Sequence, residues 1–297
     1  KHFSTQQSTN LFRSKTMVVL TSATEGDYVL SFEGSAHFSD SNEVVNVELE
    51  YEALRGTNTH LNSGNDEYLG TVFQSPFPGN WDNNANGNRG ADELIGGLGM
   101  PGQAIRDNFE GGKDDDFVYG GSGGNDYLQG NFGDDTVWGS KSGQNVIRGG
   151  RDDDTLIGGA RRDMILGDFG TDILEGGGGS DFFMLRTDSN NEGLRNATAN
   201  ELEADRITDY DVAKDFIVLS GVTSKVDYTL EANGAGDTLV KVMQSGDQLI
   251  AGVIEGVNHW DINTANVILG DTAEEMLASA DPNNFLINQT MLDSFGF

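Results

Sequence analysis

A bulky apolar residue returns every nine or ten positions from Val118 to Phe183, always two residues after an Asp or Asn. The apolar members are Val118, Leu128, Val137, Ile147, Leu156, Ile165, Leu174 and Phe183. The polar members are Asp116, Asp126, Asp135, Asn145, Asp154, Asp163, Asp172 and Asp181. Glycines fill most of the space between them. A fixed short period predicts that each repeat is one strand and one turn, and that the repeats stack as a parallel β-helix.

Two such repeats make one coil, so alternate repeats are expected on the same edge of the molecule. Stacked coils lie about 4.8 Å apart, the usual distance between neighbouring strands. We therefore expect one polar column of Asp116, Asp135, Asp154 and Asp172, and a second of Asp126, Asn145, Asp163 and Asp181. The apolar residue of each repeat is expected to face the interior.

The segments on either side of the array read mainly as β structure. Strand patterns cover residues 17–20, 28–32 and 44–51, and Asp66 and Asp92 each lie in an isolated repeat, at 64–68 and 90–94. Short strands with Gly-Asp or Asn-Gly turns follow the array, and residues 271–275 carry a helix-capping pattern. We expect a β segment or cap at 1–60, an array at 61–185 with insertions at 71–88 and 97–109, a β cap at 186–270, and a short helix and tail at 271–297.

The amino-acid composition restricts the kinds of molecule that this chain can be expected to bind. The 297 residues carry a net charge of -30, from 48 acidic against 18 basic side chains. Nucleic acid and anionic membrane surfaces would repel such a chain, whereas cations would bind it. There is no cysteine and no apolar run long enough to span a membrane, so disulfides, thiolate metal sites and membrane insertion are not expected. With 41 glycines and 36% hydrophobic residues, a repeat architecture or bound metal is needed in place of one large core.

The stacked carboxylates predict calcium sites. Like charges about one strand spacing apart repel, and Ca²⁺ accepts roughly six to eight oxygens from carboxylates and backbone carbonyls. Glycine turns can direct carbonyls inward, whereas Mg²⁺ prefers a tight octahedron that retains water. The expected ligands are Asp66, Asp92, Asp116, Asp126, Asp135, Asn145, Asp154, Asp163, Asp172 and Asp181. Asn145 lowers the ligand charge and two steps contain ten residues, so we expect roughly four to six ions rather than a full ladder.

Two stretches resemble the RTX nonapeptide, Gly-Gly-x-Gly-x-Asp-x-apolar-x, of secreted calcium-binding β-roll proteins. They are Gly149 to Ile157 and Gly176 to Met184. The resemblance implies an all-β fold, a right-handed parallel β-roll with β-rich N- and C-terminal caps. It also implies calcium held between turns by the first six residues of each repeat, and type I secretion without an N-terminal signal peptide. Residues 205–210 and 214–220 resemble the strand pair that closes such rolls.

These features predict a secreted calcium-binding structural protein, part of a surface layer, sheath, matrix or extracellular filament. The expected partners are calcium, further copies of the chain or a cell-surface matrix. One alternative is an adhesin or polysaccharide-binding module that uses the 71–108 insertions, where Phe73, Phe77 and Trp81 lie. Another is the non-catalytic C-terminal part of a secreted enzyme. No catalytic residues are predicted, because the Gly-x-Ser-x-Gly match at 120–124 is repeat glycine and the four histidines are isolated.

Overall fold

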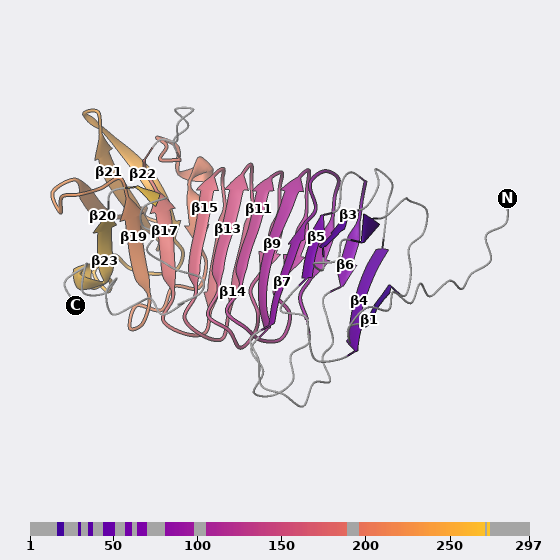
Figure 1. Ribbon diagram of the computed structural model, residues 1–297. Coiled ribbons are helices and arrows are strands. Elements are labelled where there is room, and N and C mark those ends of the chain that lie inside the picture. Colours follow the sequence, from indigo (N-terminus) through magenta and orange to yellow (C-terminus); the bar gives the residue numbers. More distant parts are fainter. Residues whose placement is uncertain are drawn as a thin grey trace.

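The computed structural model describes residues 17–20, 29–30, 35–37, 44–50, 57–60, 64–69, 81–97, 105–188, 196–270 and 272–273. Two long sheets face each other along one axis, and the chain passes from one to the other in every coil (Figure 1). Phe73, Phe77, most of the helix expected at 271–275 and the C-terminal tail lie outside the described residues.

Sheet I, as we name it, has twelve strands. In spatial order they are β1 (Met17–Leu20), β4 (Val44–Glu50), β6 (Glu67–Leu69), β8 (Glu93–Ile95), β10 (Phe117–Tyr119), β12 (Thr136–Trp138), β14 (Thr155–Gly159), β16 (Ile173–Gly177), β18 (Asp205–Ile207), β22 (Asp247–Ile254), β21 (Thr238–Gln244) and β20 (Tyr228–Ala232). Pairing is parallel from β4 to β22, and antiparallel at both ends.

Sheet II has eleven strands. In spatial order they are β2 (Val29–Leu30), β3 (Ser35–His37), β5 (Thr57–His60), β7 (Trp81–Asn86), β9 (Ile105–Lys113), β11 (Tyr127–Phe132), β13 (Val146–Arg151), β15 (Met164–Phe169), β17 (Phe182–Arg186), β19 (Phe216–Ser220) and β23 (Val267–Gly270). All neighbours from β3 onward are parallel. Short 3₁₀ helices occur at Glu201–Glu203 and Thr264–Asn266.

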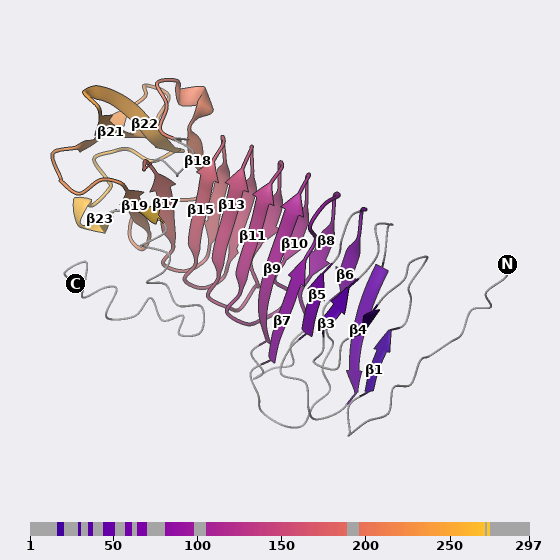
Figure 2. The ribbon, with the colours of Figure 1, turned by 45° about the horizontal axis from the view of Figure 1, so that its top comes forward.

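The strands stack in register, as Figure 2 shows from a tilted view, and this builds the parallel β-roll predicted from the repeat period. Each apolar repeat residue pairs with its counterpart one coil away, for example Val137 with Leu156 and Ile147 with Ile165. All of these repeat residues are fully buried and belong to one cluster between the sheets. The core is therefore a stack of single-residue layers.

Truncating a core residue should cost far more than truncating its outward neighbour. Leu174 is fully buried in β16, whereas Ile173 beside it is 44% exposed. We expect Leu174→Ala to lower the free energy of unfolding by about 2–5 kcal/mol, since the stacked layers can collapse only partly into the cavity. Ile173→Ala is the matched control and should change it by about 0.5 kcal/mol or less. Urea unfolding in saturating calcium measures both, and equal losses would contradict this packing.

Strand β7 and the first part of β9 lie in the two segments, 71–88 and 97–109, that were expected to be insertions. The polar strand β7 pairs along its whole length with β9, and Ala85 is buried beside Phe109. Asn84 Oδ1 accepts a hydrogen bond from Asn108 Nδ2 at 3.0 Å, and Asn86 donates to Glu110 at 2.5 Å. Such a strand lacks the β-branched residues that identify strands in sequence, because its pairing depends on neighbouring coils and polar ladders.

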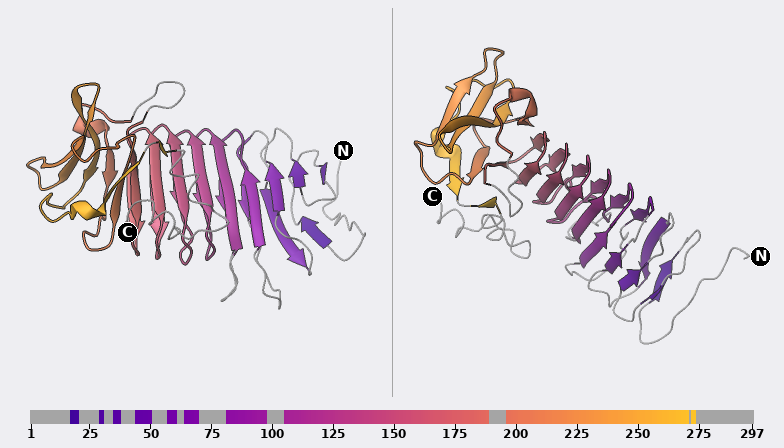
Figure 3. Two further views of the ribbon diagram at one scale, coloured as in Figure 1. Left: turned by 60° about the vertical axis from the view of Figure 1, so that its left-hand side comes forward. Right: turned by 90° about the horizontal axis from the view of Figure 1, so that it is seen from above.

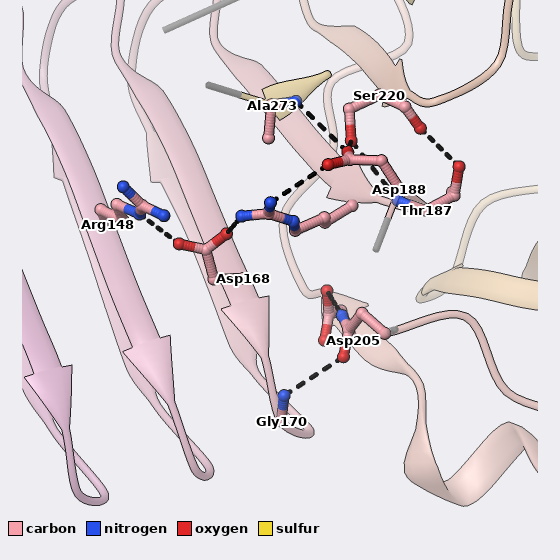
Figure 4. Close-up of polar contacts among 10 residues, drawn as sticks. Arg148, Asp168, Gly170, Thr187, Asp188, Asp205, Ser220 and Ala273 are labelled. Carbon is pink, nitrogen blue, oxygen red and sulfur yellow. Dashed lines mark hydrogen bonds and ion pairs between the residues drawn. The ribbon is translucent and has the colours of Figure 1, made fainter. Parts of the chain in front are cut away.

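The C-terminal end of the roll carries a buried ionic network on the outer face of sheet II (Figure 4). Arg186, only 1% exposed, reaches Asp168 at 2.5 Å and Asp188 at 3.1 Å, and its guanidinium lies over the Phe169 ring. Arg148 pairs with the other oxygen of Asp168. The network therefore connects three successive strands of sheet II, β13, β15 and β17.

The sheets continue into an antiparallel extension. Figure 3 shows β20, β21 and β22 projecting beyond the stacked coils at the end opposite the N-terminus. Thr198 pairs with Ile250 of β22, and Tyr210 donates a hydrogen bond to the carbonyl of Asp215 at 2.9 Å. The apolar core thus continues past the last glycine repeat, from the parallel coils into the antiparallel strands β20 to β22.

Candidate metal centre

The first predicted column of acids forms a ladder beside the strands of sheet I. In each step the backbone N–H of one Asp donates to Oδ1 of the Asp one coil further on. The Oδ1 atoms of Asp116, Asp135 and Asp154 accept in this way at 2.7, 2.8 and 2.9 Å. We name this set column I; its members are Asp66, Asp92, Asp116, Asp135, Asp154, Asp172 and Asp205. Their exposed fractions are 3% or less.

The second predicted column forms the same ladder beside sheet II. We name it column II; its members are Asp107, Asp126, Asn145, Asp163, Asp181 and Asp215. The predicted alternation of repeats between two edges is therefore confirmed by the register of the strands and by these hydrogen bonds. Each acid uses one oxygen to bind the preceding coil, which leaves the other oxygen for a further partner.

Three ladder members were not predicted as site residues. Asp107 precedes Asp126 in column II, and Asp205 and Asp215 follow the last regular repeats. All three keep the spacing of the array, since Phe109, Ile207 and Ile217 stand two residues later and are fully buried. A search for an Asp followed two residues later by a bulky apolar residue, without the requirement of a nine-residue period, would have found them.

The second carboxylate oxygens identify the candidate cation sites. Buried Oδ2 atoms that accept no hydrogen bond from the described residues include those of Asp92, Asp116, Asp126, Asp135, Asp154 and Asp172. Buried carboxylate oxygens that have no partner are costly, and a bound cation would remove that cost. The six predicted residues Asp92 to Asp172 in this set thus have the oxygen atoms that a hard cation requires.

A glycine stands opposite each of these oxygens. A Cβ placed on Gly111, Gly130, Gly149 or Gly167 would approach the Oδ2 of its own repeat closer than 3.0 Å, a separation that real Cβ atoms do not show. The carbonyl oxygen of Gly130 also lies beside the Gly111 position, and that of Gly167 beside Gly149. We call this arrangement of glycine, Asp Oδ2 and neighbouring glycine carbonyl a cradle. Only glycine leaves the cradle open.

A calcium ion in a cradle would be coordinated by backbone carbonyl oxygens as well as by carboxylate oxygens. Among the described residues, no three His, Cys, Asp or Glu side chains converge on one point. A cation there would therefore need backbone carbonyls to complete its coordination, and Ca²⁺ accepts mixed carboxylate and carbonyl ligands. Asp66 and Asp181, which complete the predicted set with Asn145 and Asp163, also lie in the ladders. The number of ions, roughly four to six, stays a prediction from the sequence.

Burial dominates the electrostatics of the ladders. It raises the pKa of Asp116 and Asp154 to about 9, and that of Asp135 to about 7, and neighbouring carboxylates add to the rise. The pKa of Asp172 is also raised well above its usual value, first by burial and then by Asp205 and Asp154. Without a cation these groups therefore resist ionisation near neutral pH.

The raised pKa values predict how pH acts on the calcium-free protein. A folded pKa above the unfolded value means that the native state binds more protons, so its stabilisation is present below about pH 4 and is lost as pH rises through the folded values near 7 to 9. We expect calcium-free protein to keep more β structure at pH 5 than at pH 9. Circular dichroism of chelator-treated samples tests this, with light scattering to control for aggregation near the pI. Greater order at pH 9 would contradict it.

An elongated parallel β-roll with glycine cradles and ladders of buried acids defines a class of calcium-binding repeat protein. Residues 102–123, 121–156 and 148–183 match the family profile described as the RTX calcium-binding nonapeptide repeat (4 copies). Residues 102–183 therefore consist of RTX calcium-binding nonapeptide repeats, as the two nonapeptides at 149–157 and 176–184 suggested. No curated protein matches the chain.

The matched family is a calcium-binding repeat, which supports calcium as the ion that the repeats of residues 102–183 bind. The matched segments contain Asp116, Asp126, Asp135, Asn145, Asp154, Asp163, Asp172 and Asp181, whereas Asp66 and Asp92 lie before them. Within the described part of the chain, no helix has the length and apolar character that a membrane crossing requires.

Proposed function

We propose that this chain is a secreted structural protein that orders its roll, and assembles with further copies, when calcium enters the cradles. The observation that carries the proposal is the row of buried Oδ2 atoms without a hydrogen-bond partner in the described part of the chain, among them those of Asp116, Asp135 and Asp154. A chain of net charge -30 attracts divalent cations and repels anionic partners. Calcium, which is scarce inside cells and abundant outside, would thus couple folding to arrival outside the cell.

The residues proposed to hold calcium are the acids of columns I and II that face a glycine cradle. Bound calcium would supply positive charge and coordination sites to oxygens that the fold otherwise leaves buried and unsatisfied. The protein's own contribution is to fix each Oδ1 on the preceding backbone N–H, which aims Oδ2 at the glycine carbonyls. Ligand binding to the native state alone stabilises it in proportion to the logarithm of calcium concentration.

A calcium titration followed by circular dichroism tests this function. We expect a rise in β signal with a midpoint on the order of 0.1–1 mM, the range of extracellular calcium modules. Magnesium is the control and should produce little change, because it retains its water shell. A protein whose spectrum does not change with calcium, whether it is folded or unfolded throughout, would overturn the coupling of folding to metal.

The strand order supports assembly. Sheet I ends at β20, an antiparallel strand, and sheet II ends at β23. Terminal strands offer backbone groups to which another copy can add a strand. We expect particle mass in light scattering to rise with protein concentration in saturating calcium and to fall when calcium is removed. A strict monomer at high concentration and saturating calcium would leave calcium folding intact but exclude self-assembly.

Polysaccharide binding is a second candidate, favoured by aromatic side chains on the outer face of sheet I. Trp138 is 41% exposed, and its ring contacts those of Phe117 and Tyr119 with centroids 5.4 and 6.3 Å apart. Exposed aromatic faces can stack on sugar rings. If so, Trp138→Ala should reduce retention in native gels that contain dextran or alginate, whereas the equally exposed Ile173→Ala should not. Unchanged retention of Trp138→Ala would exclude this surface.

A further inference from the structure

Column II contains one position whose chemistry differs from that of the cradles. A Cβ on Gly120 would lie 2.5 Å from Oδ2 of Asp126, and a Cβ on Gly139 would lie 2.5 Å from Nδ2 of Asn145. The amide nitrogen of Asn145 therefore occupies the place that a carboxylate oxygen occupies one coil earlier. An amide NH₂ group is a donor and has no lone pair to offer a cation.

The amide of Asn145 is fully engaged by its surroundings. Nδ2 donates to the carbonyl of Ser140 at 3.1 Å and to Oδ1 of Asp163 at 2.8 Å. Oδ1 accepts from Ser140 Oγ at 2.9 Å and from the backbone N–H of Asp126 at 3.4 Å. Asn145 is fully buried, so each of these bonds replaces one that water would otherwise make.

These partners determine which way the amide points. Reversing it would set the NH₂ group against the N–H of Asp126, and would set Oδ1 against the Ser140 carbonyl and the Asp163 carboxylate. Both contacts are repulsive, so the orientation follows from the hydrogen-bond network. Turning an oxygen toward the cradle would thus break bonds without forming equivalent ones.

Asp163 is also satisfied without a cation. Its Oδ1 accepts from the backbone N–H of Asn145 at 2.6 Å as well as from Nδ2, and its Oδ2 accepts from the N–H of Gly159 at 2.6 Å. By contrast, Oδ2 of Asp135 and Oδ2 of Asp154, in column I, have no hydrogen-bond partner among the described residues. The donors around Asp163 supply the positive partial charge that a cation would supply in a cradle.

We propose that the gap between Asn145 and Asp163 is a hydrogen-bonded clamp that takes no calcium, and that calcium enters the cradles of column I and the Asp126 position. We call Ser140, Asn145, Gly159 and Asp163 the Asn145 clamp. The inference rests on the proposed function, because it concerns where calcium binds. It changes the ligand set expected from the sequence, which included Asn145 and Asp163. The two edges of the roll then differ. Calcium would join the coils along column I, whereas hydrogen bonds of the Asn145 clamp join the coils in the middle of column II.

The test is a crystal structure of the calcium-loaded full chain with anomalous data collected at long wavelength, combined with native mass spectrometry. We expect anomalous peaks beside Asp116, Asp135 and Asp154 and none between Asn145 and Asp163. We also expect Asn145→Asp to bind one more ion than the wild type, since the substitution removes both amide donors and supplies an oxygen. Asp135→Asn is the matched control at a cradle and should bind at least one ion fewer.

The outcomes separate the two proposals. A calcium peak between Asn145 and Asp163 in the wild type, or equal ion counts in the wild type and Asn145→Asp, would overturn the clamp while leaving calcium binding elsewhere intact. A wild type with no calcium at any position would overturn the proposed function and the clamp with it. The wild-type map decides the question even if Asn145→Asp fails to fold.

Discussion

Gly149→Ala should weaken calcium binding roughly tenfold or more and lower stability by about 1–3 kcal/mol. The new Cβ would lie closer than 3.0 Å to Asp154 Oδ2 and to the carbonyl oxygen of Gly167, two atoms that line one cradle. Neither can move away freely, because Asp154 Oδ1 is held by the N–H of Asp135 at 2.9 Å and Gly167 lies within β15. The methyl group therefore either displaces the metal ligands or forces the coils apart.

Gly178→Ala is the matched control for this effect. Gly178 also belongs to a glycine-rich turn of the array, but the atoms nearest to its Cβ position are 3.6 Å away, an ordinary contact distance. We expect its calcium midpoint and stability to stay near those of the wild type, within about 0.5 kcal/mol. Calcium titrations of both variants by circular dichroism and calorimetry make the comparison. Equal effects of the two substitutions would show that the cradle geometry does not control calcium binding.

Arg186→Met should destabilise the calcium-loaded protein by roughly 3–5 kcal/mol, because removing one partner of a buried ion pair leaves an uncompensated charge. Asp168, also 1% exposed, would keep only Arg148, and Asp188 would lose its contact with the guanidinium. Met has similar length and fills the space above Phe169, so the substitution mainly removes charge and hydrogen bonds.

Arg206→Met is the control for charge removal. Arg206 pairs with Glu255 at 2.5 Å, but the two side chains are 29% and 38% exposed, so the pair is expected to contribute about 0–1 kcal/mol. Urea unfolding in saturating calcium, monitored by circular dichroism, compares the two variants. A small loss for Arg186→Met, similar to that for Arg206→Met, would mean that the buried network is replaceable and does not hold the end of the roll.

The regular array could be predicted because the residues within one repeat determine its strand, its turn and its buried side chain. Each repeat contains an Asp, an apolar residue such as Leu156 and a glycine turn. It packs against another repeat of the same kind, so its structure can be read from its own sequence. This local pattern was sufficient to predict the parallel roll, the two columns and the buried residue of each repeat in the array. It also led to the RTX resemblance and to calcium as the ion.

Elements that depend on unlike neighbours escaped prediction. The asparagine-rich strand β7 forms because β5 and β9 pair with it on either side. Asp205 and Asp215 join the columns although the glycine period has already ended. Asp168 aligns with Gly150 of the preceding coil and has a φ of 79°, and it pairs there with Arg148 and Arg186 from neighbouring strands.

The sequence by itself determined the repeat, the parallel roll and the class of ion, because a period of stacked carboxylates and glycines has few other physical solutions. Only the tertiary structure decided which oxygens lack partners and which are already satisfied. At Asn145 the sequence shows a weaker ligand, whereas the fold brings Ser140, Gly159 and Asp163 around it and turns a donor toward the cradle. That difference arises from hydrogen bonds between residues of different coils, and no pattern within a single repeat contains it.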